Sequence, residues 1–266
     1  MKNPNKLSGM TLLELLIVVV IIAVLASLGF LGISKGIQSA KAARTTDNLR
    51  QLGNGIRGVM TEGVSTGHTP PGMFPPYGGR FSGEGNGSGE FTWISLVAEY
   101  LGVGNNNPSD FNDKPVFTTD PSTTVFQNPL SNNKMGEGQS LPMAIKANQP
   151  EMSGSFLYNA YIGSYETSGN ANSATGDGRK PRLRNDGNIP RPDITILLTE
   201  ANDENLSASV WTGWAGTRSK GNYRDSCHCL MVDGHVELIP NSIFSDSAGA
   251  AYYFQITKPN KPSSVR

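Results

Sequence analysis

Two short segments near the C-terminus hold residue types that bind transition metals. Cys-His-Cys stands at residues 227–229, and Asp-Gly-His follows at residues 233–235. Thiolate, imidazole and carboxylate groups are the usual protein ligands of zinc, and they must converge on one point to hold it. The elements around these segments therefore decide whether they form a metal site.

The surrounding sequence predicts a β-hairpin. Strand-like residues flank Asp233-Gly234, which suits a two-residue type I′ turn. That turn would pair Met231 with Val236 and put the two cysteines on one face and the two histidines on the other. The predicted apolar face carries Cys227, Cys229, Met231, Val236 and Leu238, and the opposite face carries His228, His235 and Glu237. We therefore expect buried thiols and no metal site, and a disulfide between residues two apart is too strained.

Two further groups of side chains have ligand-binding chemistry. Glu200, Asp203 and Glu204 carry oxygen ligands for calcium, but their spacing matches no recognised calcium motif and a solvated loop explains them as well. Trp211 and Trp214 would suit an aromatic platform for a carbohydrate, although aromatic side chains are more often part of a core. We expect no cofactor, and calcium is the one open alternative.

Catalytic chemistry has little support in the sequence. The chain has three histidines, and none stands in a nucleophile–base pattern. Residues 32–36, Gly-Ile-Ser-Lys-Gly, match the hydrolase pattern G-x-S-x-G, but they continue an apolar helix where that pattern needs a strand-to-helix turn. The formal net charge is zero, with 22 basic and 22 acidic residues, so no global field attracts nucleic acid. We expect neither an enzyme nor a nucleic-acid-binding protein.

One carboxylate, Glu14, stands inside a strongly apolar run. Residues 12–31 contain no other charge and would form a helix about 30 Å long, which is the thickness of bilayer hydrocarbon. The leader, residues 1–9, has two lysines and no acid, which keeps it cytoplasmic by the positive-inside rule. An ordinary signal peptide has a shorter apolar core and a closer cleavage site than residues 40–42 provide. A plain anchor leaves Glu14 unexplained, because acids within membranes mark a partner or a function.

The sequence Gly-Met-Thr-Leu-Leu-Glu at residues 9–14 resembles the N-terminus of type IV pilins and type II secretion pseudopilins. The resemblance implies that a prepilin peptidase cuts after Gly9 on the cytoplasmic side. It also implies that Met10 becomes the N-methylated first residue, where the family usually has Phe. Glu14 then lies at the family's fifth mature position.

This chemistry gives Glu14 a role. Cleavage frees an ammonium on Met10, four residues before Glu14. When two such helices pack together, the carboxylate of one can meet the ammonium of the next, and the pair fixes the axial stagger between subunits. We therefore expect a structural subunit of a pilus or a type II secretion-type pseudopilus, in which Glu14 sets the assembly register. The alternative is a membrane-anchored extracytoplasmic protein that binds a ligand or carbohydrate and does not polymerise.

The expected partners and location follow from the resemblance. The partners are a prepilin peptidase, copies of the chain or other pilin-like subunits, the inner-membrane assembly machinery and membrane lipid. The chain would be a single-pass protein of the bacterial inner membrane, with its N-terminus cytoplasmic and its head extracytoplasmic. Assembly would then move it to a pilus or pseudopilus at the cell surface.

The predicted fold class is α+β, with a long N-terminal helix packed on a small, loop-rich antiparallel sheet as in pilins. After the leader we expect a membrane-spanning half of the helix at residues 10–31, an amphipathic half at 32–62 and a head at 63–266. No proline interrupts the helix, so any local melting would fall at its glycines. Gly and Pro total 31 and 17 residues, and the longest predicted loops are residues 63–90, 103–153 and 164–192.

Within the head, the patterns predict several short elements. An amphipathic helix should begin after Thr92 and end at Gly102. Strands are expected within residues 155–163, 193–200, 209–216 and, more weakly, 251–257. Two segments resemble a large group of bacterial pilin-like proteins: Asn-Leu-Arg-Gln-Leu-Gly at residues 48–53 and Asp-Gly-His-Val at residues 233–236. That group often has a histidine ten residues before the Asp, where this chain has Tyr223.

Overall fold

The chain divides into two compact units, residues 1–41 and 42–266. The computed structural model describes residues 10–62, 72–75, 93–104, 117–120, 123–131, 156–159, 161–162, 187, 189–201, 209–210 and 219–254. Most of the three long predicted loops, together with Gly9 and Thr92, lies outside the described residues.

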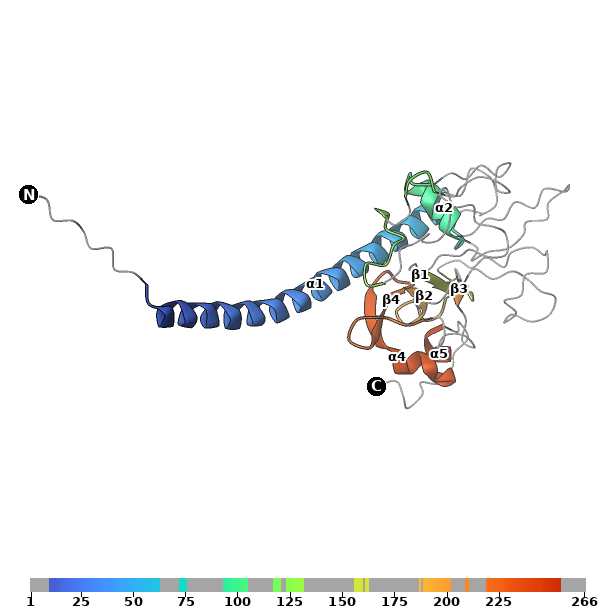
Figure 1. Cartoon of the computed structure of the whole chain (residues 1–266). Coiled ribbons are helices and arrows are strands. Elements are labelled where there is room, and N and C mark those ends of the chain that lie inside the picture. Colours follow the sequence, from blue (N-terminus) through green and yellow to red (C-terminus); the bar gives the residue numbers. More distant parts are fainter. Residues whose placement is uncertain are drawn as a thin grey trace, which may run out of the picture. The chain divides into compact units, whose positions relative to one another are not determined.

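The predicted long helix is confirmed. Helix α1 spans Leu12–Glu62, 51 residues without a break (Figure 1). It passes through its glycines without melting, and residues 32–36 are helical, so the strand-to-helix turn of a hydrolase nucleophile is absent there.

The head contains a mainly antiparallel sheet in the order β3-β1-β2-β4-β5. Its four antiparallel strands are β1 (Phe156–Asn159), β2 (Ile196–Glu200), β4 (Ser226–Met231) and β5 (Val236–Pro240). The short β3 (Ser209–Val210) pairs parallel with β1. Together with α1, this arrangement confirms the predicted α+β fold, and three of the four predicted strand regions contain a strand.

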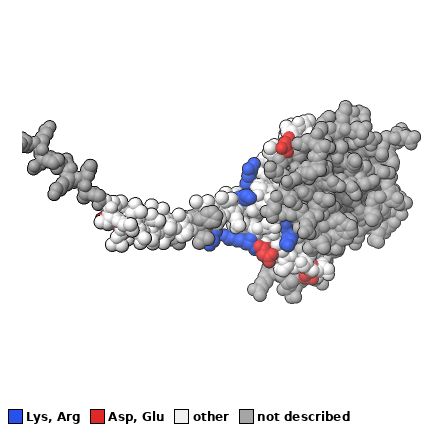
Figure 2. All heavy atoms as spheres, in the orientation of Figure 1, with Lys and Arg blue, Asp and Glu red and all other residues white. Residues whose placement is uncertain are grey.

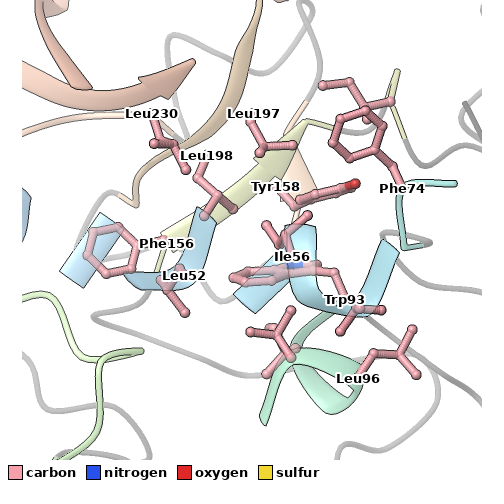
Figure 3. Packing of buried hydrophobic residues seen from close by; sticks show 14 of the residues in the cluster. Leu52, Ile56, Phe74, Trp93, Leu96, Phe156, Tyr158, Leu197, Leu198 and Leu230 are labelled. Carbon is pink, nitrogen blue, oxygen red and sulfur yellow. The ribbon is translucent and has the colours of Figure 1, made fainter. Parts of the chain in front are cut away.

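One face of the sheet packs against the C-terminal part of α1. Leu49, Leu52 and Ile56 of α1 are fully buried in the same cluster as Leu198 and Leu230 of the sheet (Figure 3). Burial of each such side chain contributes about 1.5–3 kcal/mol. The periodic apolar positions 49, 52, 56 and 59 therefore carry the load that the sequence assigned to them.

Helix α2 (Trp93–Tyr100) completes this cluster beside the C-terminal end of α1 (Figure 1). The Trp93 ring stacks on the Tyr158 ring, with centroids 5.6 Å apart and planes inclined by 20° (Figure 3). The helix ends as predicted at Gly102, whose φ of 71° is left-handed. The N–H of Gly102 donates to Glu99 O and that of Val103 donates to Ala98 O, which is a Schellman motif.

The other face of the sheet is covered by two short helices, α4 (Asn241–Ser245) and α5 (Ser247–Phe254). Phe244 and Phe254 pack there, with ring centroids 5.8 Å apart. The weak strand prediction for residues 251–257 is therefore wrong, because residues 251–254 belong to α5. β2 is buried on both faces, which explains its nearly continuous apolar sequence.

Glycines of α1 allow close packing in the head. A Cβ placed on Gly53 would lie 2.8 Å from Leu230 Cδ2, and one on Gly55 would lie 2.8 Å from Val97 Cγ1. Contacts that short do not occur between carbon atoms, so a larger residue would push the neighbouring element away. These glycines cost helix propensity, and the close approach of β4 and α2 is what they allow.

We predict that Gly55→Ala lowers the free energy of unfolding of the head by about 1–2 kcal/mol. Overpacking costs about 1–3 kcal/mol and the better helix propensity of alanine returns about 1 kcal/mol. Val97 is fully buried and β-branched, so it cannot rotate away. The measurement is denaturant unfolding of the full chain in detergent, followed by near-UV circular dichroism.

Asn54→Ala is the matched control, because Asn54 is the exposed neighbour on the same helix. It should leave the stability unchanged or raise it by a few tenths of a kcal/mol, from helix propensity alone. A Gly55→Ala protein as stable as Asn54→Ala would show that Gly55 does not limit the packing.

Candidate functional site

The first turn of α1 is closed by a reciprocal pair of hydrogen bonds. The N–H of Thr11 donates to Glu14 Oε2 at 2.8 Å, and the N–H of Glu14 donates to Thr11 Oγ1 at 3.3 Å. The Thr11 hydroxyl also donates to Glu14 Oε2, at 3.0 Å. This is a capping box, with Thr11 as the N-cap and Glu14 as the third helical residue.

The capping box gives Glu14 a structural role that our sequence interpretation missed. The carboxylate satisfies an N–H at the start of the helix and lies at the positive end of the helix dipole. The signal was present, because Thr-x-x-Glu before an apolar run is the sequence pattern of this cap. Thr11 therefore joins Met10 and Glu14 in the candidate site. No described contact tests the expected pairing of Glu14 with the ammonium of another chain.

The helix that follows presents apolar side chains along its whole described N-terminal part. Every large hydrophobic side chain from Leu12 to Leu25 is between 44% and 84% exposed. Side chains are described up to residue 27 and again from residue 33. An apolar surface of this extent requires a cover, either lipid or another protein chain. Among the described residues, no helix combines the length and the apolar character needed to span a bilayer.

The C-terminal hairpin forms, but its predicted register is wrong by one residue. Cys229 pairs with Glu237 and Leu230 with Val236. The loop has three residues, 232–234, closed by Met231 N–H to His235 O at 2.8 Å, and Gly234 adopts a φ of 100°. A type I turn followed by a glycine with positive φ is the usual three-residue hairpin loop.

The reason for the different register is Val232, which the prediction had assigned to the strand. Its N–H donates to Thr195 O at 2.9 Å, and its side chain is buried in the cluster under α1. A slip of one residue exchanges the faces of one strand against the other. Glu237 and His235 therefore fall on the cysteine side, and the predicted grouping of His228, His235 and Glu237 is wrong.

The separation of the cysteines from His228 is confirmed. Cys227 and Cys229 are buried on the α4–α5 side of the sheet, and both thiols lie near Thr199 Oγ1, at 2.9 and 3.4 Å. Burial, with smaller contributions from the neighbouring Cys229 and Glu200, raises the pKa of the Cys227 thiol well above its ordinary value. A buried thiol with a raised pKa is a poor nucleophile and a poor metal ligand. No group of three or more potential ligands occurs among the described residues.

A buried polar network links α1 to the sheet through Glu200, which is completely buried at the end of β2. Its Oε1 accepts a hydrogen bond from Asn128 Nδ2 at 3.2 Å, and its Oε2 accepts one from the N–H of His228 at 2.8 Å. The His228 Nδ1 atom lies 3.3 Å from the same Oε2. Asn128 Oδ1 in turn accepts a hydrogen bond from the Thr45 hydroxyl of α1 at 3.1 Å.

This network bears on the calcium alternative. Both oxygens of Glu200 already accept hydrogen bonds inside the core, so Glu200 does not face an open loop. Asp203 and Glu204 lie outside the described residues, as do Trp211, Trp214 and His68. Calcium binding and an aromatic platform therefore stay untested predictions.

Residues 4–30 match the family model described as the prokaryotic N-terminal methylation motif. The chain carries this methylation motif. The match contains Gly9, Met10, Thr11 and Glu14, together with the exposed apolar part of α1. No curated protein and no solved structure gives a match to the chain.

The methylation motif supports the coarse part of the sequence prediction. It implies a prepilin-like precursor that is anchored in the inner membrane and processed by a prepilin peptidase. It is also the first element of pilins and pseudopilins, so the resemblance noted from residues 9–14 is confirmed for residues 4–30. The motif lies within the first of the two units.

We predict that Glu200→Ala destabilises the head by about 2–4 kcal/mol. The change leaves the amide of Asn128 and the N–H of His228 without their acceptor in the core, and unpaired buried donors carry a penalty of this order. Thermal and urea unfolding of the full chain in detergent measure the effect.

Glu237→Ala is the control, because it removes an exposed carboxylate from the adjacent part of the same sheet. It should change the free energy of unfolding by no more than about 0.5 kcal/mol. Equal stabilities for the two variants would mean that the buried network does not hold the head together.

Proposed function

We propose that the chain is a pilin-like structural subunit that is cut after Gly9, N-methylated at Met10 and assembled through α1 into a pilus or type II secretion-type pseudopilus. The observation that carries the proposal is the methylation motif at residues 4–30 on a helix whose apolar side chains are exposed. A motif for processing and a surface that needs a cover occur on the same residues.

The apolar surface suits two successive environments. Before assembly, residues 10–31 would lie in the inner membrane, where lipid covers them. After extraction, the same side chains would pack against the helices of neighbouring subunits. Each subunit then offers its helix to the next copy by a head-to-tail contact, which propagates into a helical filament.

Glu14 suits both environments because its capping role and its pairing role are compatible. In the free chain its Oε2 satisfies the Thr11 N–H and hydroxyl. A carboxylate has about four acceptor positions, so the cap leaves room for an ammonium from another subunit. An ion pair withdrawn from water is strongly sensitive to the loss of one partner, which would make the register specific.

The head supports a structural subunit, since its described polar residues serve packing. The buried Glu200 network joins α1 to the sheet, and the thiols are enclosed. The alternative of an anchored binding protein that does not polymerise rests on Trp211 and Trp214, and no described contact favours it.

The first experiment measures the intact mass of the membrane-extracted chain after expression with an active prepilin peptidase. We expect the loss of residues 1–9 and the gain of one methyl group on Met10, because the motif places the cut after Gly9. A Gly9→Val chain is the control and should keep its leader. An unprocessed wild-type chain beside a processed reference prepilin would contradict the proposal.

We also predict that Glu14→Gln is processed normally but gives at least tenfold less filament. Glutamine keeps the capping box and removes the charge, so the variant separates the two roles of Glu14. The measurement is the sheared surface or pseudopilus fraction from cells that carry the assembly machinery. Glu62→Gln, an exposed change at the other end of α1, is the matched control. Filaments at wild-type yield from Glu14→Gln would refute the register role.

A further inference from the structure

Every charge on α1 between Glu14 and Asp47 is positive. Residues 15–34 are uncharged, and then Lys35, Lys41 and Arg44 follow before the first acid. All three basic side chains are exposed. Figure 2 shows basic side chains beginning beyond the uncharged N-terminal part of the helix. The net charge of the chain is zero, so this is a local concentration of charge on one element.

The spacing of the three residues along the helix fits the boundary of a bilayer. With a rise of 1.5 Å per residue, Lys35 lies about 6 Å beyond residue 31, Lys41 about 15 Å and Arg44 about 20 Å. The headgroup layer is roughly 5–8 Å thick on each side of the hydrocarbon. Side chains on a helix lean toward its N-terminus, and long basic side chains extend to reach an interface. Lys35 would therefore lie among the headgroups, with Lys41 and Arg44 leaning back toward them.

The three side chains also surround the helix. At about 100° per residue, Lys41 is rotated by about 240° and Arg44 by about 180° from Lys35. Ala42 and Thr45 are buried in the head, whereas their neighbours Lys41 and Arg44 stay exposed. We call Lys35, Lys41 and Arg44 the basic collar.

We propose that the basic collar binds the phosphates of anionic phospholipids in the extracytoplasmic leaflet. This inference rests on the membrane-stored form in the proposed function. The partner is lipid because the collar directly follows the apolar segment. A basic group close to an anionic surface changes association by about fivefold. Extraction into a filament would have to release these lipids, so the collar would set how firmly the subunit is held in the membrane.

The test uses the full chain in vesicles of phosphatidylcholine with phosphatidylglycerol. Electron paramagnetic resonance of trace spin-labelled lipids measures the association of phosphatidylglycerol relative to phosphatidylcholine at the protein surface. For the wild-type chain we expect a severalfold preference for phosphatidylglycerol that falls as salt is added, since salt screens the attraction. In the triple variant Lys35→Gln, Lys41→Gln and Arg44→Gln the ratio should fall toward one.

Arg50→Gln is the matched control, because Arg50 is also exposed on α1 but lies about 28 Å beyond residue 31, out of reach of the headgroups. It should keep the wild-type lipid preference. A triple variant with the wild-type ratio would overturn the proposal, and so would an Arg50→Gln chain that loses as much preference as the triple variant.

Intact mass separates this inference from the proposed function. If the chain stays unprocessed and unassembled but keeps the collar-dependent lipid preference, the collar inference holds and the pilin-like function fails. If processing and assembly are normal but the lipid preference is absent in the wild-type chain, the collar inference alone is wrong. Near-UV circular dichroism of the triple variant confirms that its head is folded, because the collar residues lie outside the core.

Discussion

The contact between α1 and the sheet is the interaction on which the described head depends. Residues 49–60 of the helix supply one wall of the larger core, and β1, β2 and β4 supply the other. Gly53 brings the helix backbone against Leu230, and Arg57 donates from Nη2 to Val232 O at 2.7 Å. The Glu200 network adds a buried polar link at the same interface. Without the helix, the apolar face of the sheet would lie open to water, so the head and the C-terminal part of α1 are one cooperative structure.

Patterns with a strong local period predicted the structure well. The absence of proline and the regular apolar spacing gave α1 within two residues of its observed start, and Gly102 gave the end of α2. The sequences of β1, β2 and β4 were apolar enough to identify. These features are encoded by neighbours in the chain, so they need no knowledge of the tertiary contacts.

The errors come from contacts between distant residues. Asp233-Gly234 is compatible with a two-residue or a three-residue loop, and Val232 chose the second because its N–H pairs with Thr195 and its side chain enters the core. Residues 251–254 have strand-forming side chains, yet they form a helix that covers the open face of the sheet. At the candidate site, Thr11 was missed although its pattern was local, since attention to a partner for Glu14 obscured its own helix end. The resemblance at residues 48–53 and 233–236 has a physical basis, because these segments lie in or next to the same core.

The sequence distance across this core has a consequence for how the protein is made. The hydrogen bond from Arg57 to Val232 joins residues 175 positions apart, and the helices that cover the second face end at residue 254. Contacts of such separation form late, because a long stretch of chain must be ordered before they close. During synthesis, the apolar face of α1 at residues 49–60 therefore waits uncovered until nearly the whole polypeptide has emerged. A chain truncated before β4 would expose that stripe permanently, and cellular quality control would meet it as an unfinished protein.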